Sequence, residues 1–519
     1  MADVCLLLEG TYPYVTGGVS SVVHRMIASL PNTSFQLVFI GVRFDEMLRL
    51  KYTLPPNVEG VQEIFLYDDF EHNGRTDRPL KSRQLKSLQI LHYYLHQTKN
   101  EGAPLGRLGA ARLSSALNVL FPAKNALESP LFRSLSSKEM WHLLKREYYQ
   151  LGADIPFIEF FYTWRSAHIP IYRILSHQYP RAKIYHSMCT GYAGLAGVQA
   201  AQQNRAPLFI SEHGIYAWER AIEIAKANWL YTPDETQLFT EDAGDRMRRW
   251  WVDFFRNMSR IAYGYASEII TLYEDNQRRQ IEDGASPEKS RIIPNGVSSK
   301  FQGLRLANPP WSGPSGNRKM VLGFIGRIVP IKDILTLVKA VRAVADRFPN
   351  IICNIVGPWE EDEDYYEQCL NMVHFLGLKD VIFFKGKMKA EEVYQTIDLL
   401  LLTSISEAQP LVILESNSAG VPVVATDVGS CRELLDGRTE ADLLLGRSGL
   451  IANPGDAEGI AERILQFVYS PDLWADMQQA GMQRVASFYQ EAELMSEFDV
   501  LYRSHIAGAV GQGAKPWQA

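Results

Sequence analysis

The sequence predicts an α/β protein made of two doubly wound, Rossmann-like domains that face each other across a cleft. Short, continuously apolar segments alternate with amphipathic helical segments, and this alternation stops at a linker and then restarts. A length of 519 residues also exceeds what one hydrophobic core usually serves. Because ligands of open α/β sheets bind beyond the carboxyl ends of the strands, we expect the cleft to hold the functional site.

The first βα unit lies at the start of the chain. An apolar segment at residues 4–8 is followed by a turn-rich loop that ends in Gly17 and Gly18. An amphipathic helix from about Val19 and a second apolar segment at residues 35–42 come next. Strand, loop, helix and strand in this order form a βαβ unit, so we expect a parallel sheet.

Residues from about 70 to 150 interrupt the alternation. They contain the helical segments QLKSLQILHYYLHQ and KEMWHLLKREYYQL and no convincing strand. We therefore expect a helical insertion in the first domain. The alternation then returns, with strands at AKIYHSM, PLFISEHG, SEIITLY and RIIPNGV.

Domain boundaries follow from a segment rich in Pro, Gly and Ser at residues 301–318, which is the expected linker. We assign residues 1–300 to an N-terminal domain and residues 319–489 to a C-terminal domain. The last segment, 490–519, is expected to begin as a helix, and its periodicity leaves open whether it packs back on the first domain.

Composition excludes several classes of protein. Hydrophobic residues make up 46% of the chain and charged residues 22%, with a formal net charge of -6. This balance is typical of a soluble, folded protein, and it disfavours general binding of nucleic acid. The N-terminus lacks a basic segment typical of a signal peptide, and no apolar run approaches the roughly 18 residues that span a bilayer. We therefore expect a cytoplasmic protein.

The five cysteines are scattered along the chain. They show no CxxC pattern and no Cys/His ligand spacing, so the sequence indicates neither a disulfide framework nor a zinc site.

Two short patterns suit a bound anion. The second domain opens with GFIGRIVPIKD, in which Arg327 follows a strand and Lys332 precedes Asp333 at an expected helix start. A planar guanidinium and an ammonium beside a helix start suit a diphosphate, as do open backbone amides behind Gly17 and Gly18. Each pattern has a simpler explanation, namely solvated cations and a tight turn.

A pair of carboxylates flanks a helix start in DLLLLTSISEAQPLVILESNSAG. An apolar strand ends at Ser404, Glu407 lies in the following loop, and Glu415 lies in the second turn of the next helix. Two such carboxylates could hold the vicinal hydroxyls of a sugar. Equally, Glu407 could be a loop charge and Glu415 a solvated helix residue, and the spacing leaves both open.

The segment EAQPLVILE resembles the two-glutamate signature of family 4 retaining glycosyltransferases, which have the GT-B fold. Four other pieces occur in the family's order: the Gly17-Gly18 loop, SEHG at 211–214, IIPNGV at 292–297, and Gly326-Arg327 with Lys332. Within this family, the opening stretch, the helical insertion and the QPLVILES helix are most similar to the cytosolic glycosyltransferases of Pel exopolysaccharide biosynthesis.

The resemblance implies a set of catalytic residues. Arg327 and Lys332 match the pair that contacts the donor diphosphate. Glu407 matches the carboxylate that faces the hydroxyls of the transferred sugar. His213 matches the histidine of the first domain that lies beside the reacting centre.

The resemblance also implies a donor-binding set, which shares Arg327 and Lys332 with the catalytic set. Glu415 matches the carboxylate that holds the ribose hydroxyls, and Lys387 and Met388 match the segment whose backbone reads the base. The remaining members contribute backbone amides near the sugar and phosphates: Gly17, Gly18, Pro410, Leu411 and Val412. Ala408-Gln409-Pro410 departs from the usual small or aromatic residues after the first glutamate, which puts the sugar specificity in doubt.

The activity that the resemblance implies is transfer of a hexose from a UDP-sugar with retention and without a metal or other cofactor. UDP-glucose is the first candidate and UDP-N-acetylhexosamine the second. The acceptor would be a growing polysaccharide, and an inner-membrane Pel synthase complex would be a partner, which would place the enzyme in the cytoplasm and at the periphery of that membrane. A nucleotide-sugar epimerase and a non-catalytic regulator that binds a UDP-sugar are the alternatives.

Two further patterns resemble functional groups. Asp362-Glu363-Asp364 looks like the DxD metal motif of other glycosyltransferases, but it opens a predicted helix, where acidic residues complement the helix dipole. His186 ends a predicted strand, where it is either a cleft residue or a structural histidine with satisfied hydrogen bonds.

Overall fold

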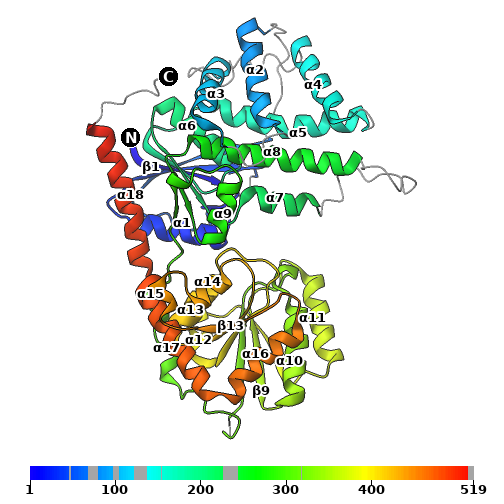
Figure 1. Ribbon diagram of the computed structural model, residues 1–519, viewed down its shortest axis with the longest axis vertical. Helices are drawn as coiled ribbons and strands as arrows, with labels where there is room; N and C mark the ends of the chain where they lie inside the picture. The colour runs from blue at the N-terminus through cyan, green and yellow to red at the C-terminus, as the bar shows by residue number, and fades with distance from the viewer. Residues whose placement is uncertain are drawn as a thin grey trace. The chain divides into compact units, whose positions relative to one another are not determined.

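The computed structural model describes residues 1–45, 48–67, 80–97, 104–121, 137–152, 155–225, 243–316 and 318–511. The chain divides into two compact units (Figure 1). The first unit comprises residues 1–293 together with 497–519, and the second comprises residues 294–496.

The first unit is built on a seven-stranded, fully parallel sheet with the strand order β3-β2-β1-β4-β5-β6-β7. Its strands are β1 (Ala2–Glu9), β2 (Phe35–Gly41), β3 (Val58–Phe65), β4 (Ala182–Ser187), β5 (Leu208–Glu212), β6 (Glu268–Thr271) and β7 (Ser290–Ile292). The central strands are buried along nearly their whole length, as their continuous apolar sequences predict.

Helices cover this sheet and build the insertion. They are α1 (Gly18–Ser29), α2 (Ser82–Leu95), α3 (Gly106–Leu120), α4 (Lys138–Leu151), α5 (Phe157–Ser176), α6 (Tyr192–Asn204), α7 (Tyr216–Ala225), α8 (Ala243–Tyr265), α9 (Glu274–Glu282) and the 3-10 turn η3 (Pro287–Lys289). Where the predicted insertion is described it is helical, as α2, α3 and α4. These helices pack on α5 and α8 (Figure 1), and a single hydrophobic core joins them to the sheet.

The second unit is built on a six-stranded, fully parallel sheet with the order β10-β9-β8-β11-β12-β13. Its strands are β8 (Met320–Ile325), β9 (Ile351–Val356), β10 (Ile382–Gly386), β11 (Leu399–Leu402), β12 (Val423–Thr426) and β13 (Gly449–Ala452). Its helices are α10 (Ile334–Arg347), α11 (Glu363–Phe375), α12 (Ala390–Thr396), α13 (Leu411–Ala419), α14 (Cys431–Asp436), α15 (Glu440–Leu443), α16 (Ala457–Tyr469) and α17 (Pro471–Phe488). Two parallel sheets covered by helices confirm the predicted pair of doubly wound domains.

The unit boundary lies between residues 293 and 294, whereas composition suggested a linker at 301–318. That segment belongs to the second unit, where it forms the 3-10 turns η4 (Ser299–Phe301) and η5 (Leu304–Ala307). It is anchored there because Arg305 is buried and lies 2.6 Å from the carboxylate of Asp398, and because Trp311 donates its Nε1–H to the carbonyl of Val468. Its Pro and Gly residues thus reflect an irregular path on a packed surface.

The last helix, α18 (Glu491–Gly511), returns the chain to the first unit, to which its residues from 497 onward belong. The hydroxyl of Tyr502 lies 2.6 Å from Nδ1 of His186, and its ring stacks on Phe209 with centroids 5.9 Å apart. The segment expected at 490–519 is therefore helical as far as residue 511 and packs back on the first domain.

All five cysteines are free thiols. Over the described ranges, none of the helices combines the length and the apolar character that crossing a lipid bilayer requires.

Candidate functional site

The carboxyl ends of β8, β9 and β10 come close together because glycines stand where side chains would collide. Gly357 has φ +153, and a Cβ added to it would lie 1.8 Å from the carbonyl oxygen of Gly326. The amide of Gly357 in turn donates to the carbonyl of Gly386 at 2.9 Å. The loop that leaves Gly326, and carries Arg327 and Lys332, therefore starts at the carboxyl edge of the second sheet.

Two hydrogen bonds join this loop to the loop after β11. The backbone N–H of Ile405 donates to the carbonyl of Ile331 at 2.8 Å, and the hydroxyl of Thr403 donates to the carbonyl of Lys332 at 2.9 Å. The short 3-10 turn η6 (Pro330–Lys332) leads into Asp333, whose side chain caps α10 through the N–H of Thr336. The cap and the two contacts fix the backbone of Lys332.

Lys332 and Glu407, two of the predicted catalytic residues, form an ion pair. Nζ of Lys332 lies 2.5 Å from Oε1 of Glu407, and the hydroxyl of Ser404 donates to the same oxygen at 2.6 Å. The side chains are 20% and 12% exposed, so this charge pair is shielded from bulk water but reachable from it. It places a cation and a carboxylate where the anionic and hydroxyl groups of a ligand can compete for them.

Arg327 lies in a different environment. Its guanidinium donates to both carboxylate oxygens of Glu361 at 2.6 Å, and both side chains are more than half exposed. An exposed pair of this kind contributes only about 0–1 kcal/mol to stability, so a bound ligand could replace it at little cost. The structure thus pairs Arg327 with the acidic segment before α11 and Lys332 with Glu407.

The helix start between the two glutamates is open. Pro410 occupies the N-cap position of the nine-residue helix α13, and no side chain caps the amides that follow at Leu411 and Val412. Glu415 lies one turn further along the same helix, and its Oε2 is 3.1 Å from the hydroxyl of Tyr394. Burial, followed by the Glu415 carboxylate, raises the pKa of Tyr394 well above its usual value, so this hydroxyl stays protonated and can donate.

The segment between Glu407 and the helix is held from two sides. Gln409 is buried, and its Oε1 accepts the backbone N–H of Asn295 at 2.6 Å, which ties the IIPNGV run to this segment. On the other side Gly429 approaches so closely that a Cβ there would lie 2.1 Å from the carbonyl oxygen of Glu407. Ala408-Gln409-Pro410 is therefore a rigid part of the second unit.

Lys387 and Met388, predicted to lie where a base is read, follow β10 directly and are exposed. Nζ of Lys387 is 3.4 Å from the carboxylate of Glu360, the neighbour of Glu361. The adjacent residues Glu360 and Glu361 therefore pair with Lys387 and Arg327, respectively. Both cations belong to the predicted donor-binding set.

The DxD-like segment begins α11. Oδ1 of Asp362 accepts the N–H of Tyr365 at 3.0 Å, and Glu363 and Asp364 occupy the first turn. Asp362 is therefore the N-cap of the helix, and the acids beside it complement the helix dipole.

In the first unit, the predicted glycines mark an exposed helix start. Gly17 is extended, and a Cβ added to Gly17 or Gly18 would meet nothing within 4 Å. Local packing therefore does not demand glycine there, and α1 begins without a side-chain cap. His213 follows β5, where burial and the charge of Arg25 lower its pKa to about 4, so the imidazole is neutral near pH 7.

His186 is fully buried and satisfied, because its ring nitrogens lie 2.6 Å from the Tyr502 hydroxyl and 2.7 Å from the Ser211 hydroxyl. This arrangement favours the structural explanation of His186.

Two acidic residues that are absent from the predicted catalytic and donor-binding sets end strands of the first sheet. Glu9 ends β1 and accepts the hydroxyl of Tyr216 at 2.8 Å, and Glu212 ends β5 and accepts the amide of Gln280 at 3.0 Å. Burial raises the pKa of Glu212. In both sequences, VCLLLEG and LFISEHG, an acidic residue ends an apolar run, and this pattern could have identified Glu9 and Glu212 as candidates.

The second unit, with its parallel sheet and this edge of charged and open backbone groups, contains residues 310–484, which match the family model Glycosyl transferases group 1. Residues 2–288, more than half of the chain, match the family model described as Domain of unknown function (DUF3492), and the chain belongs to that family.

Two curated relatives match the chain in part. The D-inositol 3-phosphate glycosyltransferase of Corynebacterium urealyticum is 24% identical over 256 residues, which cover 46% of this chain and 57% of the relative. The capsular polysaccharide biosynthesis glycosyltransferase CapM of Staphylococcus aureus is 22% identical over 262 residues, which cover 49% of this chain and 66% of the relative. The chain thus spans less than two thirds of the length of these relatives.

Among solved structures, Alr3699/HepE of Anabaena in complex with UDP and glucose is 14% identical, with a TM-score of 0.53, and the match covers 97% of this chain and 100% of that one. At this identity the likeness shows the shared GT-B fold.

Proposed function

We propose that the chain is a retaining glycosyltransferase that transfers a hexose from a UDP-sugar to a growing exopolysaccharide, with UDP-glucose favoured and UDP-N-acetylhexosamine second. The observation that carries this proposal is the Lys332–Glu407 pair, held by two backbone contacts at the carboxyl edge of a Rossmann-like sheet. The uncapped start of α13 follows Glu407 in the sequence, and Glu415 lies one turn further along that helix.

The mechanism would rest on electrostatics and positioning. In the proposed complex the donor diphosphate takes the place of Glu407 beside Lys332, and Arg327 leaves its weak surface pair to bind the same phosphates. Charge grows on the departing diphosphate in the transition state, so two cations and the open amides of α13 stabilise that state more than the ground state.

The carboxylates would then orient the donor. Glu407, released from Lys332, accepts hydrogen bonds from the hydroxyls of the transferred sugar, and Glu415 accepts those of the ribose. Front-face attack, in which a leaving phosphate oxygen helps to deprotonate the acceptor, needs no enzymic nucleophile or general base, and positioning supplies much of the acceleration.

Sequence likeness supports the polysaccharide acceptor. The opening stretch, the insertion and the QPLVILES helix resemble PelF, the glycosyltransferase of Pel exopolysaccharide biosynthesis, and the relative CapM belongs to capsular polysaccharide biosynthesis. On this proposal the enzyme works in the cytoplasm at the inner membrane, with a Pel synthase complex as partner. The N-cap role of Asp362 supports a donor site that needs no metal.

The proposal is tested by binding and turnover of isotopically labelled UDP-glucose and UDP-N-acetylglucosamine, with and without a polysaccharide acceptor. We expect donor binding, slow hydrolysis without acceptor, and a product that retains the anomeric configuration. Failure of every UDP-sugar to bind or react would contradict it. Release of an epimer or exchange of a sugar-ring proton without acceptor would instead identify an epimerase. Donor binding without hydrolysis, unchanged in Glu407→Ala, would identify a regulator.

A further inference from the structure

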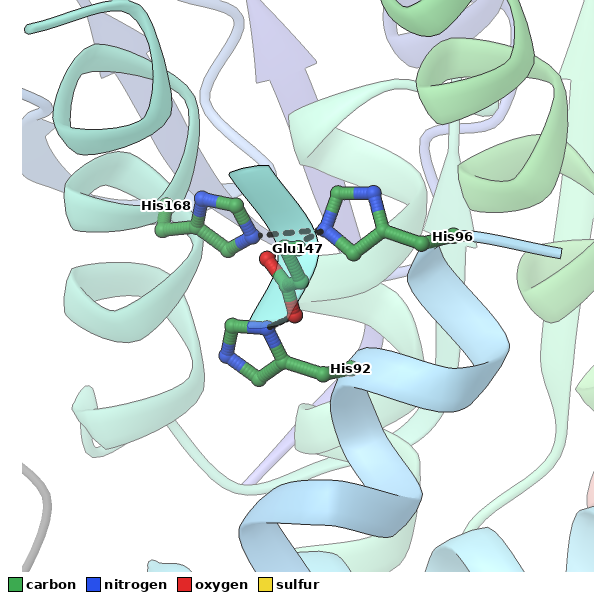
Figure 2. Close-up of side chains that lie close together, drawn as sticks. All are labelled: His92, His96, Glu147 and His168. Atoms are coloured by element: carbon green, nitrogen blue, oxygen red, sulfur yellow. Dashed lines mark hydrogen bonds and ion pairs between the residues drawn. The ribbon is translucent and has the colours of Figure 1, made fainter. Parts of the chain in front are cut away.

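Four side chains of the helical layer, none of them assigned above, lie close together in the first unit (Figure 2). His92 lies on α2 and His96 is the C-cap of the same helix, Glu147 lies on α4, and His168 lies on α5. One nitrogen from each histidine and one carboxylate oxygen all lie within 4.8 Å of one another. The side chains are 0–15% exposed.

The separations between these atoms are close to those of ligands around one ion. Nδ1 of His92 is 2.8 Å from Oε1 of Glu147, Nε2 of His96 is 2.8 Å from Nε2 of His168, and Nε2 of His96 is 3.8 Å from Oε2 of Glu147. In a tetrahedral zinc site with Zn–N bonds of about 2.0 Å, neighbouring ligand atoms are about 3.3 Å apart. Because the four ligand atoms all lie within 4.8 Å of one another, side-chain shifts of up to about 1 Å would convert the cluster into a coordination shell.

A hydrogen bond on the far side of the His168 ring points the lone pair of that ring toward the centre of the cluster. Nδ1 of His168 is 2.6 Å from the carbonyl oxygen of Trp164, and a carbonyl can only accept, so Nδ1 carries the proton and Nε2 presents a lone pair to the cluster. Nε2 of His92 is 2.5 Å from the hydroxyl of Tyr172. Metal-bound histidines usually make such outer contacts to a carbonyl or another oxygen through the second ring nitrogen.

The surroundings of the Glu147 carboxylate also favour a cation at the centre of the cluster. Its carboxylate is 8% exposed, and its other hydrogen bond comes from the indole N–H of Trp164 at 2.5 Å. In the part of the chain that the structure describes, histidines are its only ion-pair partners. A buried carboxylate without a positive partner is costly.

We propose that His92, His96, Glu147 and His168 form a structural site for one divalent transition-metal ion, Zn²⁺ in first place, that ties α2, α4 and α5 together. Three imidazoles and one carboxylate suit Zn²⁺ and exclude the oxygen-seeking ions Ca²⁺ and Mg²⁺. Four protein ligands fill a tetrahedral shell and leave no position for a substrate, which is typical of a structural site. The inference does not depend on the proposed function, because it uses none of the donor-binding residues.

The first test is the metal content of the full chain, purified without a polyhistidine tag, which would bind the same ions. We expect elemental mass spectrometry to find about one zinc ion per protein chain. After chelation, titration with Zn²⁺ alone should restore one tight site and raise the Tm, and Co²⁺ should give the strong visible absorption of a tetrahedral complex. A folded wild-type chain that neither carries zinc nor binds Zn²⁺ stoichiometrically would overturn the proposal and identify the cluster as a metal-free hydrogen-bond network.

Variants locate the site. His96→Gln, His168→Gln and Glu147→Gln should each weaken Zn²⁺ binding by about 100-fold or more, because each removes a ligand. Tyr172→Phe should weaken it less, by about 10- to 100-fold, because it removes only the outer contact to His92. His142→Gln is the matched control, because His142 is exposed on α4, the helix that carries Glu147, and its loss should leave binding unchanged. Equal zinc affinity in all five folded variants would place the ion elsewhere and overturn the assignment.

Discussion

The ammonium group of Lys332 lies 2.5 Å from the carboxylate of Glu407, although the two residues are 75 positions apart and belong to different loops. On the proposed function, a donor phosphate would take the place of Glu407 beside Lys332, and sugar hydroxyls would take the place of Lys332 beside Glu407. Donor binding would then open this pair, so we expect the two residues to respond unequally to substitution.

Lys332→Ala should weaken UDP binding by about 10- to 100-fold, because it removes a charge-assisted hydrogen bond to phosphate. Arg327→Ala should act in the same direction. Glu407→Ala should have a smaller effect on UDP, because it frees Lys332 and removes a contact that UDP alone does not make. Titration calorimetry measures all three, with the exposed Lys339→Ala on α10 as control. Equal affinities in the three site variants would refute these roles.

Glu415→Ala should lower the affinity for UDP and leave the affinity for inorganic pyrophosphate unchanged, because this carboxylate is assigned to the ribose. Tyr394→Phe should do the same more weakly, since it removes the hydroxyl that lies 3.1 Å from Glu415. Competition binding with the two ligands separates the contributions. An equal loss of affinity for pyrophosphate would contradict the ribose assignment and indicate that Glu415 maintains the structure of the whole site.

Asp362→Asn should leave both donor turnover and stability nearly unchanged, because asparagine also caps helices while it lacks the carboxylate that a metal needs. Asp362→Ala should lower the stability of α11 by about 1 kcal/mol through loss of the cap. Turnover assays and thermal unfolding check the two effects. A fall in the turnover of Asp362→Asn that added Mn²⁺ restores would assign a catalytic metal to this segment.

Glu219 should make the stability of the first unit depend on pH. Desolvation and the charge of Glu212 raise its pKa from 4.5 to about 7. The folded state therefore binds the proton more tightly than the unfolded state, so stability falls as pH rises from 4.5 to about 7 and then levels off. Glu219→Gln should remove this fall and raise the Tm at pH 8 relative to the wild type.

Thermal unfolding between pH 4.5 and pH 8 measures the effect of Glu219→Gln. Glu223→Gln on the same helix is the control, because the Glu223 carboxylate forms an ion pair with Arg220. Parallel pH profiles for the wild type and Glu219→Gln would show that Glu219 titrates normally.

The two parallel sheets could be predicted from the sequence because buried parallel strands appear in it as continuous apolar runs. The edge strand β3 (Val58–Phe65) was not predicted, because its sequence VEGVQEIF mixes polar and apolar residues and forms no continuous apolar run. The linker was placed too late because Pro and Gly indicate irregular backbone and do not report that Arg305 and Trp311 are buried.

The residues of the candidate site could be picked out singly from the sequence, but the ion pairs between them could not. Spacing brought Glu407 and Glu415 to attention, but nothing local could show that Glu407 meets Lys332 or that Arg327 meets Glu361. The histidine cluster was overlooked for a related reason. His92 and His96 have the one-turn spacing of a ligand pair, but no cysteine accompanies them in the sequence, and Glu147 and His168 join them only through tertiary packing.

Because residues from 497 onward belong to the first unit while residues 294–496 build the second, the first unit is encoded in two pieces and the second in one. During synthesis, the whole second unit leaves the ribosome before Tyr502 does. Only then can Tyr502 pack on His186 and Phe209 of the first sheet. The unit that begins the chain is thus the last to be completed, and loss of the final helix would leave its apolar face open to aggregation.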